Sequence, residues 1–302
     1  MTPIDVVFGA PFMQSAAIAL GVLAVVSAVV GVALNLRELE FVSDGLVHAV
    51  FPGVVIGFLV GGGAGPEIYF GAMVAAVIAT VLLTLAARRG AGTDAATAVL
   101  LAGTFAIGIV IVSRSTNYAT GLESLLFGQL LTISPTDLVI IGALGAVAIA
   151  LVAFTWKEQV FVAFDRRAAE ASGMAVLRYE LILNVAIALT VVAASRAVGN
   201  LLVLALLIVP AAVGRLVAFR LAVIVPVAAV TALGASFVGL VSGYWLSVDA
   251  RLTVSPSAVL VLALVAVYLV VAGVSSVARR GRGRAKALSP ANGLSPATEV
   301  SA

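Results

Sequence analysis

One aspartate and the only histidine of the chain are the residues best suited to bind a ligand. His48 follows Asp44 by four residues in the segment FVSDGLVHAVFPG, so both side chains share one face if the segment is helical. A carboxylate and an imidazole are suitable ligands for Zn²⁺, Mn²⁺ or Fe²⁺, and poor ones for Cu⁺, which prefers sulfur. Two ligands do not complete a tetrahedral site, but a symmetric dimer would contribute two such pairs around its axis. The pair indicates an incomplete site for a divalent transition metal.

The same pair also has a purely structural interpretation. Asp44 lies close to the expected start of a helix, where an aspartate often accepts hydrogen bonds from free backbone N–H groups. The imidazole of His48 would then donate to a backbone carbonyl. A cap uses only part of a carboxylate, so the two roles are compatible and the sequence leaves both open.

The composition determines which kind of element positions these residues. Of 302 residues, 63% are hydrophobic and 10% are charged, whereas a soluble domain has about 25% charged residues. A membrane-spanning helix takes about 20 apolar residues, and the apolar runs lack the alternation of a transmembrane barrel. We predict an all-α polytopic integral membrane protein with eight to nine transmembrane helices. A soluble enzyme and a nucleic-acid-binding domain are excluded, and the absence of cysteine excludes a disulfide scaffold.

Nine apolar segments are candidate spans, and prolines interrupt two of them. The segments cover residues 13–35, 45–62, 68–87, 95–113, 137–156, 177–195, 198–214, 221–243 and 257–277. The second and seventh are short and contain Pro52 and Pro210, which predicts a kink or a partial crossing. Eight spans plus one re-entrant segment is the alternative. Gly53, Gly57 and Gly61 form a GxxxGxxxG pattern that favours close helix packing, within one subunit more than between two.

The distribution of Lys and Arg predicts the orientation in the membrane. With the N-terminus outside, 14 of the 17 basic residues fall on the inner side, as the positive-inside rule requires. Only Arg114, Arg196 and Arg251 fall outside. Residues 1–277 are predicted to form the transmembrane domain, and residues 278–302 a disordered basic cytoplasmic tail near anionic lipid headgroups.

Two connecting loops are longer than a simple turn. The outer loop, residues 115–136, has an amphipathic centre around Leu125–Leu130. The inner loop is predicted to contain a short helix at about 163–174, because Asp165 suits the N-cap position and Gly173 suits a helix stop. The two lysines, Lys157 and Lys286, do not follow glycine, so the Gly-Lys pair of a Walker A loop is absent. ATP-driven transport would therefore need another polypeptide to hydrolyse the ATP.

Four segments, in order along the chain, resemble ABC-transporter permeases of the zinc/manganese/iron type. FVSDGLVHAVFPGVVIGFLVG is similar to the family's "SDALSHAVLPGVALAFLLG", and LLFGQLLTISPTDL to its external-loop pattern. FDRRAAEASGMAVLRYELIL resembles its cytoplasmic loop, and AVGNLLVLALLIVPAAVGRL its "VG-LLV-ALLI-PAA-AR" stretch. Together the matches run from about residue 30 to 265.

This resemblance implies a type II ABC importer permease that works as a homodimer in the cytoplasmic (inner) membrane. It further implies two cytoplasmic ATP-binding subunits and an extracytoplasmic metal-binding protein as partners. The chain itself would be no enzyme and would hold no permanent cofactor, with a divalent metal as transported substrate. Asp44 and His48 match the family's DxxxH metal contacts. The inner-loop helix would be the coupling helix that contacts the ATPase, through Asp165, Arg166, Arg167, Glu170 and Gly173.

The chain departs from the family pattern in two places. Gly45 stands where Ala or Thr is usual, which loosens the helix. Arg166 and Arg167 replace a frequent Pro-Glu pair, which makes the coupling surface more basic and leaves the individual contacts with the ATPase undefined.

Three other functions are weighed against a metal permease. A siderophore- or cobalamin-type ABC permease would not need the Asp/His pair, and such chains tend to be longer. A gradient-driven secondary carrier would be supported by inverted repeats, and none is evident. A membrane scaffold without transport would leave His48 and the inner-loop helix unexplained. The transported metal is not specified by the sequence.

Overall fold

The continuous apolar runs of the sequence form helices in the computed structural model, which describes residues 9–62, 65–88, 92–113, 128–248 and 255–287. The α-helices are α2 (Pro11–Leu36), α3 (Glu40–Val60), α4 (Glu67–Arg88), α5 (Thr93–Val112), α7 (Pro135–Phe154), α8 (Trp156–Phe164), α9 (Arg166–Ala171), α10 (Val176–Val217), α11 (Leu221–Val248) and α12 (Pro256–Ala287), and one 3-10 helix, η1, covers Leu130–Thr132. Within these described ranges, eight helices are long and apolar enough to cross a membrane. No strand occurs among the described residues. The predicted all-α polytopic membrane fold is confirmed.

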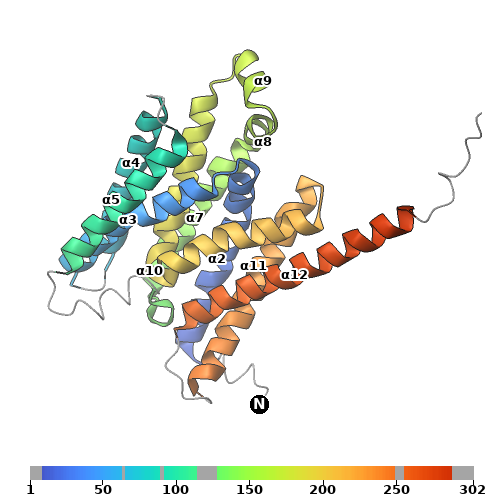
Figure 1. Ribbon diagram of the computed structural model, residues 1–302. Coiled ribbons are helices and arrows are strands. Elements are labelled where there is room, and N and C mark those ends of the chain that lie inside the picture. Colours follow the sequence, from blue (N-terminus) through green and yellow to red (C-terminus); the bar gives the residue numbers. More distant parts are fainter. Residues whose placement is uncertain (1–8, 63–64, 89–91, 114–127, 249–254, 288–302) are drawn as a thin grey trace, which may run out of the picture.

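Helix α10 contains two of the nine predicted spans and folds back on itself. A straight helix of 42 residues would be about 63 Å long. Yet Glu180 near its start contacts Arg37, directly after α2, and Arg215 near its end contacts Asn35 in the last turn of α2. The reversal occurs at Gly199, whose φ of 73° and ψ of 165° are not helical. Figure 1 shows the two halves of α10 running in different directions. The eight long helices therefore contain nine helical passages through the bundle.

Pro52 and Pro210, in the second and seventh predicted spans, both lie inside helices, and the non-helical residue of α10 is Gly199. Helix α3 is 21 residues long and includes Pro52. Helix α10 is broken at Gly199, which is 11 residues before Pro210. Proline removes one backbone hydrogen bond, which neighbouring helices can compensate in a membrane protein. A left-handed φ is a stronger constraint, because only glycine adopts it without steric cost.

The helices form two groups around a core built from α2 and α10. Helix α3 packs along both α4 and α5, while α2 contacts α7, α10 and α11. Figure 1 shows α3, α4 and α5 together on one side, with α11 and α12 on the other and the short helices α8 and α9 at one end. The largest fully buried side chains include Leu23, Phe51 and Leu206. Helix α3 thus joins the two groups, and it carries the predicted metal pair.

Glycines allow α3 and α4 to pack at backbone distance. A Cβ atom added to Gly53 would collide with the carbonyl of Gly71, and one added to Gly57 would lie 2.7 Å from the Cα of Ile68. Gly61 follows the last residue of α3 and faces Glu67, at the start of α4. The prediction that the glycine repeat packs helices within one subunit is confirmed.

The inner loop contains two short helices rather than the one predicted, because α8 begins directly after α7. Helix α9 forms where expected. Asp165 Oδ1 accepts a hydrogen bond from the Ala168 N–H at 2.9 Å, and Gly173 has a φ of 82° beyond the helix end. The predicted cap and stop are both confirmed.

Helix α12 continues through Ala287, ten residues into the segment 278–302 that was expected to be disordered. Its sequence ARRGRGRAKA contains several good helix formers that extend the preceding apolar helix. Residues 288–302 lie outside the described residues. The same holds for Leu125–Phe127 of the predicted amphipathic centre and for Arg114 and Arg251.

Candidate metal site and its supporting network

Asp44 and His48 lie on the same face of α3, as their spacing predicts. The distance from His48 Nε2 to Asp44 Oδ1 is 3.5 Å, and the two side chains are 23% and 29% exposed. Helix α3 begins at Glu40, with Leu39 at the N-cap position, so Asp44 lies in the second turn. The alternative that Asp44 caps the helix is therefore wrong. The apolar-run criterion had placed the helix start at residue 45, because it excluded the polar first turn.

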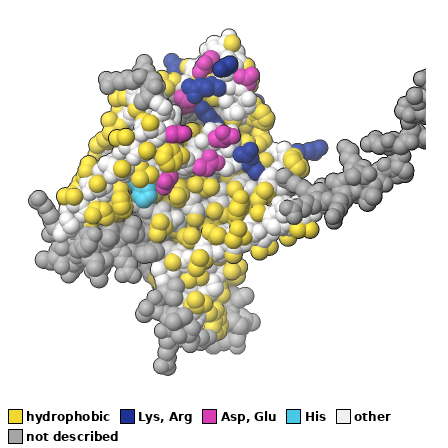
Figure 2. Space-filling model, viewed as in Figure 1, with side chains coloured by type: hydrophobic (Ala, Val, Ile, Leu, Met, Phe, Trp, Pro, Cys, Tyr) yellow, Lys and Arg dark blue, Asp and Glu magenta, His cyan; other side chains and the backbone are white. Residues whose placement is uncertain are grey.

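The surroundings of His48 leave one ring nitrogen without a partner. The imidazole stands edge-on to the ring of Phe105 on α5, with 5.2 Å between centroids and 86° between planes. Its Nδ1 atom is buried and has no hydrogen-bond partner in the described part of the chain. Figure 2 shows the single histidine on a largely apolar surface with an acidic side chain beside it. An imidazole with a free nitrogen next to a carboxylate can contribute to metal binding.

The pair alone does not form a closed site. Among the described residues, no group of three or more His, Cys, Asp or Glu side chains is placed to hold a metal ion. A stable protein site for a transition metal usually has at least three protein ligands. The geometry therefore suits brief ligation, or completion of the site by a second chain.

A second acidic residue on the same face, Glu40, was missed by the sequence analysis. Glu40 precedes Asp44 by four residues and His48 by eight, so all three follow one helix face, and each is partly exposed. Glu40 Oε1 accepts a hydrogen bond from Asn35 Nδ2 at 2.5 Å. Asn35 in turn accepts one from Arg215 at 2.9 Å. The four-residue spacing was visible in the sequence, but the expected helix start excluded Glu40.

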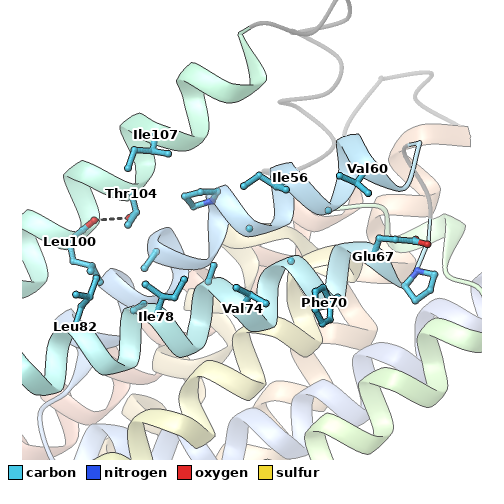
Figure 3. Close-up of a pocket in the computed structure, with 18 residues that line it drawn as sticks. Ile56, Val60, Glu67, Phe70, Val74, Ile78, Leu82, Leu100, Thr104 and Ile107 are labelled. Carbon is cyan, nitrogen blue, oxygen red and sulfur yellow. Dashed lines mark hydrogen bonds between the residues drawn. The ribbon is translucent and has the colours of Figure 1, made fainter.

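An apolar groove of about 740 Å³ lies along α3, α4 and α5, and neither Asp44 nor His48 is among its lining residues. Figure 3 shows its lining, with Ile56 and Val60 on α3 opposite Phe70 and Val74 on α4. The hydroxyl of Thr104, which also faces the groove, donates to the carbonyl of Leu100 on its own helix at 2.6 Å. The groove lining provides almost no ligands for a cation, so the groove is not the metal site.

Charged side chains gather at the end of the bundle that carries α8 and α9 (Figure 2). Glu180 Oε1 accepts hydrogen bonds from Arg37 at 3.3 Å and from Arg166 at 2.5 Å. Arg37 also donates to Gln159 Oε1 at 2.8 Å. Burial lowers the pKa of Arg37, and the nearby Glu180 carboxylate opposes this shift. These contacts connect α9 with the turn between α2 and α3.

A second buried ion pair lies at the opposite end of the bundle. Arg196 Nη1 donates to Asp137 Oδ1 at 2.5 Å, and the side chains are 13% and 4% exposed. Asp137 also accepts a hydrogen bond from the backbone N–H of Ser134 at 2.9 Å, within a capping box at the start of α7. The sequence analysis had counted Arg196 only as an outside charge. No local pattern indicated this pair, because its members are 59 residues apart.

The long apolar helices, the open Asp–His pair and the charged end with its short helices define a multi-pass membrane protein of the transport class. Residues 9–274 match the ABC 3 transport family. The chain belongs to this family of divalent-metal ABC permeases, which confirms the resemblance found in the sequence.

Several relatives are named as manganese permeases. The chain is 30% identical over 240 residues to the manganese import system permease protein ScaB of Streptococcus gordonii, covering 79% of this chain and 84% of that one. It is 30% identical over 219 residues to the manganese transport system membrane protein MntC of Halalkalibacterium halodurans, covering 72% and 74%.

Solved structures have the same arrangement of helices. The complex of PsaBC from Streptococcus pneumoniae with a Fab contains a chain that is 29% identical, with a TM-score of 0.76 and coverage of 89% and 94%. A putative metal-chelate type ABC transporter in an inward-facing conformation has a TM-score of 0.69 at 15% identity, over 86% of this chain and 85% of that one. At 15% identity, the similarity to this second structure shows a shared fold alone.

Proposed function

We propose that this chain is the membrane-spanning subunit of an ATP-driven importer of Mn²⁺. The observation that carries the proposal is the partly exposed Asp44–His48 pair inside the membrane-spanning part of α3. Ionisable residues within a membrane are costly, and they commonly mark a transport path. A carboxylate and an imidazole suit Mn²⁺, Zn²⁺ and Fe²⁺ alike. Manganese is favoured because relatives at 30% identity are named for it.

The incomplete ligand set favours a homodimer. Two copies related by a twofold axis would bring two aspartates and two histidines toward one path. The pair is exposed enough in a single chain to be reached by a second one. Each ligand would bind the ion briefly, because a closed four-ligand site would retain it.

The remaining partners follow from the family and from the charged end. The end with α8 and α9 would face the cytoplasm in the inner membrane, so that the start of α2 lies outside and the end of α12 points inside. Helix α9, with Arg166, Arg167 and Glu170 between its cap and its stop, would contact one of two ATP-binding subunits. An external binding protein would deliver the ion, and ATP would bind only to the partner subunits.

Elemental analysis of cells that express the permease with its ATP-binding subunit and binding protein tests this proposal. We expect Mn content to rise only with the wild-type chain and an active ATPase. His48→Ala and Asp44→Asn should each reduce uptake at least about tenfold, since even loss of groups that orient metal ligands costs about 10–100-fold. Asp94→Asn, at an exposed carboxylate in the first turn of α5, is the matched control.

Each alternative predicts a different result. A rise in Zn or Fe instead of Mn would change the substrate but keep the class. Uptake that persists with an inactive ATPase and stops with an uncoupler would indicate a secondary carrier. Equal uptake by wild type and both variants would remove Asp44 and His48 from the path.

A further inference from the structure

Helix α9 is held against its neighbours by a small apolar cluster of Val162, Ala169 and Val176 and by an ion pair with one carboxylate of α10. Arg166, the first residue of α9, pairs with Glu180 Oε1 at 2.5 Å and with Glu170 on its own helix at 3.1 Å. The Arg166 side chain is 60% exposed, whereas Glu180 is 21% exposed. An ion pair with one exposed partner contributes little stability, so this link can break and form again as α9 moves.

The same carboxylate holds the turn that follows α2. Arg37, which is only 6% exposed, donates to Glu180 Oε1 at 3.3 Å. Its other guanidinium nitrogen donates to Gln159, and Gln159 donates to the carbonyl of Tyr179 at 2.8 Å. A buried guanidinium needs a charged partner, because burial without one is costly. Glu180 therefore bridges an exposed contact to α9 and a buried contact to the turn.

This turn leads directly to the helix with the metal pair. Only residues 37–39 separate α2 from α3. Asn35 and Glu40 are joined across the turn at 2.5 Å, and Arg215 of α10 holds Asn35 from the other side. A shift of Arg37 therefore moves the first turn of α3, and Asp44 lies in the next turn.

We propose that Glu180 is a positioning residue that transmits movement of α9 to α3, and so couples ATP hydrolysis to the access of the ion to Asp44 and His48. The inference rests on the proposed function, since it takes α9 as the contact with the ATP-binding subunit. Glu180 suits this role because one carboxylate oxygen accepts from two guanidinium groups on different elements. A neutral amide at this position cannot neutralise either charge.

The first test needs only the permease in lipid nanodiscs. The chain has no cysteine, so Ala171→Cys on α9 and Glu38→Cys in the turn give one pair of spin-label sites per chain, and dilution with unlabelled chains isolates the pair within one chain. We expect Glu180→Gln to broaden the distribution of label distances. Arg178→Ala, an exposed charge on the same turn of α10, should leave it unchanged. An unchanged distribution in Glu180→Gln would overturn the proposed attachment.

The second test measures Mn²⁺ imported per ATP hydrolysed by the complete transporter in proteoliposomes. Glu180→Gln should lower this ratio about threefold or more, within the range by which mutations in coupling networks act, while hydrolysis continues. Glu180→Asp, which keeps the charge, should restore most of the ratio. A parallel loss of uptake, hydrolysis and thermal stability would show a merely structural role and overturn the proposal.

The two proposals can fail separately. An unchanged ratio in Glu180→Gln, with an active wild type, would overturn the coupling role and leave Mn²⁺ import intact. Absence of ATP-dependent Mn²⁺ uptake by the wild-type complex would overturn the proposed function and the coupling role with it.

Discussion

Breaking the buried ion pair between Asp137 and Arg196 should be one of the most destabilising polar changes in this chain. In Asp137→Asn, the guanidinium of Arg196 stays 13% exposed and loses its charged partner. Removal of one member of a buried pair costs about 3–5 kcal/mol. The asparagine oxygen can still accept from the Ser134 backbone, so the cap of α7 is kept.

Two further variants separate the charge from the cap. Asp137→Ala removes the charge and also the carboxylate half of the capping box, since Asp137 Oδ2 accepts from the N–H and the hydroxyl of Ser134 at 2.9 and 2.7 Å. Loss of a capping contact adds about 1 kcal/mol. In the double variant Asp137→Asn with Arg196→Gln no unpaired charge remains, and removing both partners of a buried pair is far milder than removing one.

Thermal unfolding of the purified permease in detergent is the assay. From highest to lowest, the expected order of midpoint temperatures is wild type, the double variant, Asp137→Asn and Asp137→Ala. The reasoning would be refuted if Asp137→Asn melted with the wild type. The single variant Arg196→Gln is measured as well. The reasoning would also be refuted if the destabilisation in the double variant equalled the sum of those in Asp137→Asn and Arg196→Gln, because the residues would then act independently.

Three more predictions concern packing, capping and pH. Gly71→Ala should destabilise the protein by about 1–3 kcal/mol through overpacking against the α3 backbone. Gly103→Ala, which has open space around it, should stabilise the protein by up to about 1 kcal/mol. Thermal unfolding compares the two variants, and equal effects would contradict the packing argument. Asp165→Ala should speed hydrogen exchange in α9 by loss of a cap worth about 1 kcal/mol, and Asp165→Asn should not; similar exchange in both would show that the cap is unimportant. Mn²⁺ binding, measured by electron paramagnetic resonance, should weaken on acidification because imidazole binds metal only when neutral. This acid sensitivity should decrease in His48→Ala, and an unchanged pH profile in that variant would show that the imidazole is not a ligand.

Much of the fold was predictable because apolar runs of this length have few alternatives. In a bilayer each backbone polar group must be paired within its own segment, which makes long apolar runs helical. The predicted positions of the helix ends were less accurate. Helix α3 begins at Glu40 and not at residue 45, because its polar first turn is stabilised by Asn35 from the preceding helix. That contact belongs to the tertiary structure and has no counterpart in local hydropathy.

The candidate site was only partly predictable, for a similar reason. The shared face of Asp44 and His48 follows from helical periodicity, and so does the position of Glu40. By contrast, Arg37 donates a hydrogen bond to Glu180, which lies 143 residues further along the chain. Nothing in the sequence near either residue indicated the other.

The sequence by itself determined that the chain is a helical membrane protein, that Asp44 and His48 share a face, and that Asp165 and Gly173 delimit a short helix. These properties depend on composition and on residues within four positions of each other, so local physical chemistry decides them. Only the tertiary structure decided that α10 reverses at Gly199, and that Glu180 joins Arg37 to Arg166. Those pairings depend on how helices pack, and packing brings together side chains that are distant in the sequence.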